Sequence, residues 1–222
     1  MLYSLRDGVS YCQVDDHLIF LDLDNDRYFQ LPVRLERAFL AQLHGDTLSG
    51  AEVEELVRQN LLMPQPKSEE PQRSHAILPP SRSAIERTFR PPSLDGRVLL
   101  EVFATMYSTQ LQLKTRRLKH LVHALVDYRQ RKTVGAPATP ESSVLEASDR
   151  FRCARLYVPI KTCCLLDSLA MLRFLSYRRL SAHLVFGVTS DPFAAHCWVQ
   201  SGDWVLNDTV GNVIAHTPIR EV

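Results

Sequence analysis

The residues with the most reactive side chains lie in the last third of the chain. The segment "TCCLLDSLA" places Cys163 and Cys164 just ahead of an apolar run, and "AHCWVQSGDWVLND" adds His196, Cys197 and Asp208. A thiol attacks only as its thiolate, and a helix N-terminus with a nearby imidazolium lowers its pKa. These residue types therefore predict a cysteine nucleophile, a histidine base and an aspartate that orients the histidine.

The spacing of the histidine and the aspartate is typical of a β-hairpin. "FAAHCWVQ" and "WVLNDTV" have the pattern of two strands joined by a turn at "SGD". With a three-residue turn, Gln200 faces Trp204, and the same register sets His196 opposite Asp208. With a two-residue "SG" turn, His196 would instead face Asn207. We adopt the first register, because a charged carboxylate orients an imidazole better than an amide does.

Two other interpretations of these side chains are open. The adjacent Cys163 and Cys164 could be buried thiols at the start of a helix. A zinc site would use both of them with His196 and Cys197, but adjacent ligands on one chain bind zinc poorly. Neighbouring residues of a strand also point to opposite faces, so Cys197 is expected to face away from the side that His196 uses. We therefore expect no metal and no cofactor.

A longer pattern surrounds these residues. The order of cysteine on a helix, then histidine and aspartate on strands, is that of the papain and transglutaminase clan. Residues 97–222 closely resemble the B-protein family of lasso-peptide biosynthesis, which are transglutaminase-like leader peptidases. The matching pairs are Cys164-Leu165, Ser168-Leu169, Gly187-Val188, Pro192-Phe193, Ala195-His196, Trp198-Val199 and Asn207-Asp208. The chain departs from the family at Cys197, where alanine is usual, and at Gln200, where glutamate is common.

The resemblance implies a cysteine peptidase with Cys164, His196 and Asp208 as its catalytic residues. Cys164 is preferred to Cys163 as the nucleophile because Leu165 follows it directly, as the family pattern requires. The implied reaction is hydrolysis of the bond between the leader and the core of a precursor peptide.

The first 64 residues have the pattern of a small separate domain. Three short strands are predicted within residues 9–31, followed by helices over 33–43 and 51–62, which is the outline of a winged helix-turn-helix. This outline resembles the PqqD-like recognition element that accompanies leader peptidases, in which the leader adds a strand to the edge of the sheet. The residues expected to bind substrate are Arg27, Tyr28, Phe29, Gln30 and Leu31 of this edge and Trp198 of the peptidase.

The chain therefore divides, by prediction, into a recognition domain over 1–64, a proline-rich linker over 65–93 and a peptidase domain over 94–222. The proline-rich stretch could also be an extended arm that lies along a neighbour. One or two helices are predicted within 94–132, and a further helix over 144–157. The stretch "CLLDSLAMLRFLSYRRL" is predicted to be a helix and "SAHLVFGVTS" a strand. The fold class expected from these elements is α+β, with a winged helix-turn-helix followed by a papain- or transglutaminase-like domain.

Charge and composition restrict the classes of function. The formal net charge is +1, but residues 1–64 hold 5 Arg, no Lys and 11 Asp or Glu. An acidic winged helix argues against a regulator that binds DNA, because phosphate contact needs a basic face. The basic segment "KTRRLKH" is expected to be a solvated face or a docking surface for a partner protein.

The location of the protein is also predicted from composition. No signal peptide and no run of apolar residues long enough for a membrane span is apparent, so we expect a cytoplasmic protein with no membrane partner. The five cysteines have no framework spacing and are expected to be free thiols.

Together, these predictions describe a leader peptidase of lasso-peptide biosynthesis. Its expected partners are the precursor's leader and, by resemblance, an ATP-dependent lasso cyclase related to asparagine synthetase, with no nucleic acid involved. The main alternative is a non-catalytic scaffold that binds the leader and uses its thiols only structurally.

Overall fold

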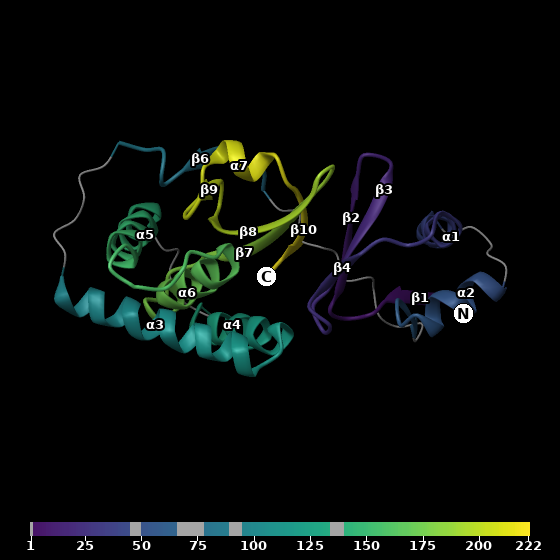
Figure 1. Ribbon diagram of the computed structural model, residues 1–222, viewed down its shortest axis with the longest axis horizontal. Helices are drawn as coiled ribbons and strands as arrows, with labels where there is room; N and C mark the ends of the chain where they lie inside the picture. Colours follow the sequence, from purple (N-terminus) through teal and green to yellow (C-terminus); the bar gives the residue numbers. More distant parts are fainter. Residues whose placement is uncertain (1, 45–49, 66–77, 89–94, 134–139) are drawn as a thin grey trace. The chain divides into compact units, whose positions relative to one another are not determined.

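The computed structural model describes residues 2–44, 50–65, 78–88, 95–133 and 140–222 (Figure 1). The chain divides into two compact units, Met1–Ala76 and Ile77–Val222. Much of the predicted linker over 65–93 falls outside the described residues. None of the helices in the described ranges is long and apolar enough to cross a membrane.

The first unit combines two small antiparallel sheets with two helices. Its elements are β1 (Leu2–Leu5), β2 (Val9–Val14), β3 (His17–Asp22), β4 (Arg27–Phe29), α1 (Val33–His44), α2 (Gly50–Arg58) and β5 (Leu62–Gln65). Strands β2, β3 and β4 pair in that order, and β1 pairs with β5. Phe20 and Phe39, both fully buried, meet edge to face at the centre of a core that also takes in Leu56 and Leu61. Apolar side chains from the three-stranded sheet and from both helices therefore share one core.

For this unit, the predicted strands and the start of the first helix are confirmed, one helix end is wrong, and one pair of strands was not predicted. The strands within 9–31 and the helix beginning at residue 33 are confirmed. The sequence pattern predicts that the second helix continues to residue 62, but this helix ends at Arg58. Asn60 takes a left-handed conformation (φ 57°), and Leu62 then enters β5. The pair β1–β5 is absent from the prediction, because its two short strands lie at opposite ends of the unit. The winged helix-turn-helix itself remains a prediction.

The second unit is built on one five-stranded sheet. Its strands, in spatial order, are β10 (Thr217–Glu221), β7 (His183–Ser190), β8 (Phe193–Ser201), β9 (Trp204–Val205) and β6 (Arg82–Ser83). Strand β6 runs parallel to β9, and the other neighbours are antiparallel. This strand lies in the stretch predicted as a linker or extended arm, so residues 82–83 of that stretch belong to the sheet of the second unit.

Helices cover both faces of this sheet (Figure 1). On one side lie α3 (Gly96–Thr115), α4 (Leu118–Thr133), α5 (Glu141–Arg155) and α6 (Cys164–Tyr177). The short helix α7 (Val210–Ile214) lies on the other side, where Val213 packs with Val185 and Trp198. Helix α6 packs against β8 on one side and against α3 on the other. This central position explains why α6 is apolar almost all round.

The hairpin that carries the candidate histidine and aspartate differs from its predicted form. Gln200 pairs with Val205 and Ser201 with Trp204, so the turn consists of Gly202 and residue 203. Gly202 takes a positive φ of 59°, the conformation that a tight two-residue turn requires. The predicted register, with Gln200 facing Trp204, is therefore wrong. Strand β9 also ends at Val205, whereas the prediction continues it to residue 210.

Candidate active site

Cys164 lies at the first residue of α6, where backbone N–H groups have no partner within the helix. The residue before it, Cys163, is the N-cap and has no side-chain capping bond. The Asp167 carboxylate holds the backbone of this residue instead, because its Oδ2 accepts the backbone N–H of Cys163 at 3.1 Å. In return, the N–H of Asp167 donates to the carbonyl oxygen of Cys163 at 2.9 Å. This reciprocal pair fixes the entry of the chain into the helix.

Arg155 extends this arrangement into the loop before the helix. Its Nε donates to Asp167 Oδ1 at 2.5 Å. Its two terminal nitrogens donate to the carbonyl oxygens of Val158 (3.0 Å) and Ile160 (2.9 Å). One guanidinium from α5 therefore holds both the loop and the capping carboxylate that set the position of Cys164.

His196 and Asp208 are brought together although the predicted strand register is wrong. His196 Nε2 lies 2.5 Å from Asp208 Oδ2. Asp208 follows the end of β9 and reaches the histidine from an irregular segment rather than from a paired strand. Its Oδ1 accepts the backbone N–H of Thr209 at 2.7 Å, and its Oδ2 also accepts Nδ2 of Asn212 at 2.8 Å. Burial alone would raise the pKa of Asp208, but these bonds, led by that from His196, lower it.

Strand β6 also contributes to holding this aspartate. Ser83 Oγ donates to the carbonyl oxygen of Asp208 at 2.6 Å. Three residues on, the Glu86 carboxylate accepts the backbone N–H of Val210 at 3.1 Å. The stretch predicted as linker therefore supports the segment that carries the aspartate.

Cys164 and His196 form an ionised pair. The hydrogen bond to Asp208, followed by that to Cys164, raises the pKa of His196 to about 9. The pKa of Cys164 is lowered to about 4 by hydrogen bonds from the Cys197 thiol first and from His196 second. Because Asp208 takes Nε2 of the ring, Nδ1 is the nitrogen left for the thiolate. The pair is therefore a thiolate and an imidazolium over the neutral range of pH.

Cys197 belongs to this site, which corrects the prediction that it faces away from it. The residue is 2% exposed, and both its thiol and its backbone N–H hydrogen-bond to Cys164. The contact with Cys164, followed by burial, raises the pKa of Cys197 well above its ordinary value, so this thiol keeps its proton and donates. Cys197 and His196 do leave opposite faces of β8. Cys164 contacts both residues because it lies beside the edge of β8, on the side to which the backbone N–H of Cys197 points.

Ser168 and Asn207 connect the elements that carry the three residues. Ser168 Oγ, on α6, donates to the carbonyl oxygen of Cys197 at 3.1 Å and accepts Nδ2 of Asn207 at 2.8 Å. Asn207 Oδ1 accepts the backbone N–H of Val199 at 2.8 Å. Val199 lies one position beyond Gln200, the last residue of β8 that pairs with β9. Ser168 is fully buried at the centre of this network, so its bonds hold α6 firmly against β8.

Trp198 lies behind His196 instead of in a substrate cleft. Its side chain is fully buried and its Nε1 donates to Gln200 Oε1 at 3.0 Å. The indole and imidazole rings stack with centroids 6.1 Å apart. A Cβ added at Gly187 would lie 2.7 Å from Trp198 Cζ3, so only glycine fits beneath the indole. The expectation that Trp198 contacts substrate is therefore wrong, because a fully buried ring presents no surface to a ligand.

The residues expected to bind the leader lie in and after β4, an edge strand of its sheet. Tyr28 and Phe29 are half-buried, and Phe29 stacks on Phe20 with ring centroids 5.2 Å apart. Arg27 and Gln30 are exposed, and the Arg27 guanidinium lies 5.0 Å from the Phe29 ring. Leu31 is 6% exposed and belongs to the core, so its side chain is not available to a leader.

Within the described residues, all five cysteines are free thiols. The same part of the chain contains no group of three or more His, Cys, Asp or Glu side chains that could hold a metal ion.

The roles of Cys197 and Asn212 in this site were not predicted from the sequence. Cys197 is an unusual residue in an otherwise matching pattern, which is its only signal, and Asn212 has none.

Comparison with known proteins shows which family the chain is similar to. A 48-residue stretch is 48% identical to the microcin J25-processing protein McjB of Escherichia coli, and it spans 22% of this chain and 23% of that relative. No solved structure matches the chain significantly. The model of the transglutaminase-like superfamily matches residues 107–221, which include α6, the β7–β8 hairpin and the segment carrying Asp208. This match covers more than half of the chain, and the protein therefore belongs to the transglutaminase-like superfamily.

Proposed function

We propose that this protein is a cysteine peptidase that removes the leader from a lasso-peptide precursor. The observation that carries the proposal is the contact of Cys164 with His196, and of His196 with Asp208, at the start of a buried helix. Family membership and the partial match to a microcin-processing protein support the same conclusion.

In the proposed reaction, the Cys164 thiolate attacks the carbonyl carbon at the junction of leader and core. The oxyanion that forms accepts the backbone N–H of Cys164 at the start of α6. The His196 imidazolium gives its proton to the departing core nitrogen, and the C–N bond breaks. This step leaves the leader as a thioester on Cys164 and releases the core with a free amine.

The second half of the reaction returns the enzyme to its starting state. His196, now neutral, takes a proton from a water molecule, which attacks the thioester carbonyl. The C–S bond breaks, the Cys164 thiolate forms again beside the imidazolium, and the leader leaves as a carboxylic acid that loses its proton to solvent. Asp208 stabilises the ring in its charged form in both resting and product states. No cofactor enters this chemistry.

We assign recognition of the leader to the first unit. Strand β4 lies at the edge of its sheet, and an extended peptide added there as a further strand would form backbone hydrogen bonds without a demanding side-chain match. Tethering the leader in this way raises the effective concentration of the scissile bond at Cys164. The free amine of the product is the group that a lasso cyclase needs to close its ring, so we expect an asparagine-synthetase-like cyclase as a partner in the cytoplasm.

The proposal is tested by incubating the full chain with a synthetic precursor and following the leader by mass spectrometry, with a parallel series that contains the cyclase and ATP. We expect the C164A variant to lose cleavage and the matched C163A variant to keep it, because Cys164 is the cysteine that contacts His196. Persistent cleavage by C164A would refute the peptidase function. Loss with C163A but not with C164A would reassign the nucleophile.

The non-catalytic scaffold makes a different prediction for the same variants. In that case C164A would leave precursor processing in the mixture unchanged, and only variants at β4 would lower affinity for the leader. The low pKa of Cys164 and its contact with His196 favour catalysis, because a structural thiol has no need to ionise.

A further inference from the structure

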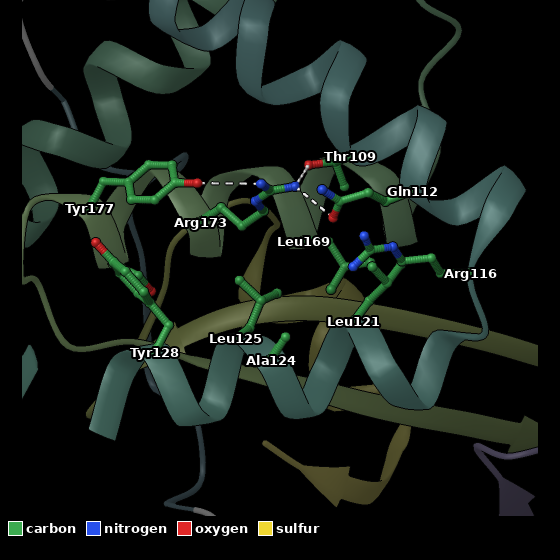
Figure 2. A pocket seen from close by; sticks show the side chains of 11 residues that line it. Thr109, Gln112, Arg116, Leu121, Ala124, Leu125, Tyr128, Leu169, Arg173 and Tyr177 are labelled. Carbon is green, nitrogen blue, oxygen red and sulfur yellow. Dashed lines mark hydrogen bonds between the residues drawn. The ribbon is translucent and has the colours of Figure 1, made fainter. Parts of the chain in front are cut away.

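A concave site lies in the helical layer of the second unit, apart from the cysteine site. A pocket of about 230 Å³ opens between α3, α4 and α6 (Figure 2). Its nearest charged group on α6, Arg173, is nine residues beyond Cys164, or about 13 Å along the helix axis. The proposed reaction uses none of the residues that line this pocket.

Arg173 extends its guanidinium across the pocket, and its partners among the described residues are neutral groups. It donates to Thr109 Oγ1 at 3.1 Å, to Gln112 Oε1 at 3.0 Å and to the Tyr177 hydroxyl at 3.3 Å (Figure 2). These bonds fix the orientation of the guanidinium, but neutral oxygens do not cancel its positive charge.

Other arginines of this unit contrast with Arg173. Arg178, one turn further along the chain, makes a two-pronged bond to the Glu101 carboxylate, and Arg155 is paired with Asp167. Both of those charges are neutralised within the protein. The charge of Arg173 is oriented but not neutralised by the described residues, which is the usual condition of an arginine that receives an anionic ligand.

A second arginine lines the same pocket. Arg116, at the C-terminal cap of α3, lies across from the Arg173 guanidinium (Figure 2). It is part of the basic segment over 114–120, in which Lys114, Arg117 and Lys119 add charge and no acidic residue occurs. Among the described residues that line the pocket there is no Asp or Glu. The electrostatic field in the pocket therefore favours a negative ligand.

The remaining walls of the pocket are apolar and aromatic. Leu121 and Leu125 of α4 and Leu169 of α6 form one side. Tyr128 and Tyr177 meet edge to face at the opposite end, with ring centroids 5.5 Å apart. Such walls suit a ligand whose charged head is joined to a hydrophobic or aromatic body.

We propose that this pocket binds a small organic anion, with a carboxylate or phosphate head on Arg173 and Arg116 and an apolar or aromatic body against the leucines and tyrosines. The guanidinium geometry matches two oxygens of either head group. The ligand would bridge α3 and α4 to α6, the helix that carries Cys164. The proposal does not depend on the peptidase function.

The test uses four probes with the full chain: phenylacetate, phenyl phosphate, benzyl alcohol and inorganic phosphate. Affinity is measured by calorimetry, and the side-chain amide signals of Gln112 in NMR spectra report binding at this pocket. We expect at least one aromatic anion to bind and to shift those signals. Benzyl alcohol, which keeps the ring without the charge, should bind at least about tenfold more weakly, as expected for loss of charged hydrogen bonds. The stronger of the two aromatic anions identifies the head group as carboxylate or phosphate.

Three variants connect the binding to the arginines. R173Q should weaken the preferred anion about tenfold or more, and R116Q several-fold. R117Q is the matched control, because Arg117 is exposed in the same basic segment and does not line the pocket. R116Q alters only an exposed side chain, so its result stands even where R173Q disturbs folding. Any of three results would overturn the proposal: benzyl alcohol binds as tightly as the anions, the R116Q variant binds the preferred anion with unchanged affinity, or the Gln112 signals do not shift at millimolar anion.

Discussion

The cysteine site of the second unit and the β4 edge of the first unit differ in how they are built. At the cysteine site, the groups that ionise and transfer protons are side chains fixed by others, as in the chain from Cys164 through His196 to Asp208. At β4, the feature proposed for recognition is the backbone edge itself, which nearly any sequence could present. The first kind of site should be sensitive to single substitutions, and the second should tolerate them.

The largest effect should follow from replacing the orienting carboxylate. D208N keeps the size of the side chain but removes the charge that holds His196 as an imidazolium. We expect kcat/KM for precursor cleavage to fall by about 100-fold or more, with leader affinity unchanged.

D203N is the matched control for that variant. Asp203 lies in the turn of the same hairpin and bonds Ser81 and Arg82, away from the thiol. Its replacement should leave kcat/KM within about twofold, as for a surface substitution. Equal losses in the two variants would show that the hairpin's stability, and not the orientation of His196, controls the rate.

A smaller effect should follow from removing the thiol that donates to Cys164. C197A deletes that donor, so the pKa of Cys164 should rise and the acidic limb of the pH profile of kcat/KM should move to higher pH. The rate at neutral pH, where the thiol stays ionised, should change little. C197S supplies a hydroxyl donor in the same place and should return the acidic limb most of the way. An unchanged pKa of Cys164 in the C197A variant would contradict the role assigned to Cys197.

The smallest effect is expected at β4. Gln30 is exposed just after the strand, and Q30A should change the dissociation constant of an isolated leader peptide by less than about threefold, because the backbone supplies the affinity. Q13A, on the opposite edge strand β2, is its control. A loss of 100-fold in Q30A would show that side chains dominate recognition, and the contrast between the two sites would then fail.

The same contrast explains what could be predicted from the sequence. Reactive side chains leave a signal in residue type and spacing, which indicated the cysteine pair, His196 and Asp208 as candidates, and the family resemblance then favoured Cys164 of the two cysteines. Their supporting network has no such signal, because Ser83 reaches Asp208 from 125 positions away in the chain, through a two-residue strand. No local pattern identifies such a contact.

The hairpin register shows a second limit. The choice of a three-residue turn rested on bringing two side chains opposite each other. The structure uses a two-residue turn and brings them together by ending β9 early, so that an irregular segment carries Asp208 to the histidine. Periodicity predicts strands that continue, and it gives no indication of where tertiary packing ends them.

The elements of the fold were predictable where hydrophobic periodicity is long. Helix α6 and strands β7 and β8 follow from it directly. Strand β10 and helix α7 are short, and neither has enough residues to establish a period. The role of Cys197 was not predicted for a different reason. Strand alternation predicts correctly which face of β8 its side chain leaves, but it does not predict that Cys164 lies at the edge of that strand.

The central claim is that Cys164 rests as a thiolate paired with His196. The most direct test is the rate of alkylation by iodoacetamide at each cysteine, followed by mass spectrometry from acidic to basic pH. We expect Cys164 to reach half of its plateau rate near pH 4, since the pKa of its thiol is lowered to about 4 and the reactive form lies above that value. A midpoint at the ordinary pKa of a cysteine, about 8.5, or faster reaction at Cys163, would contradict the account.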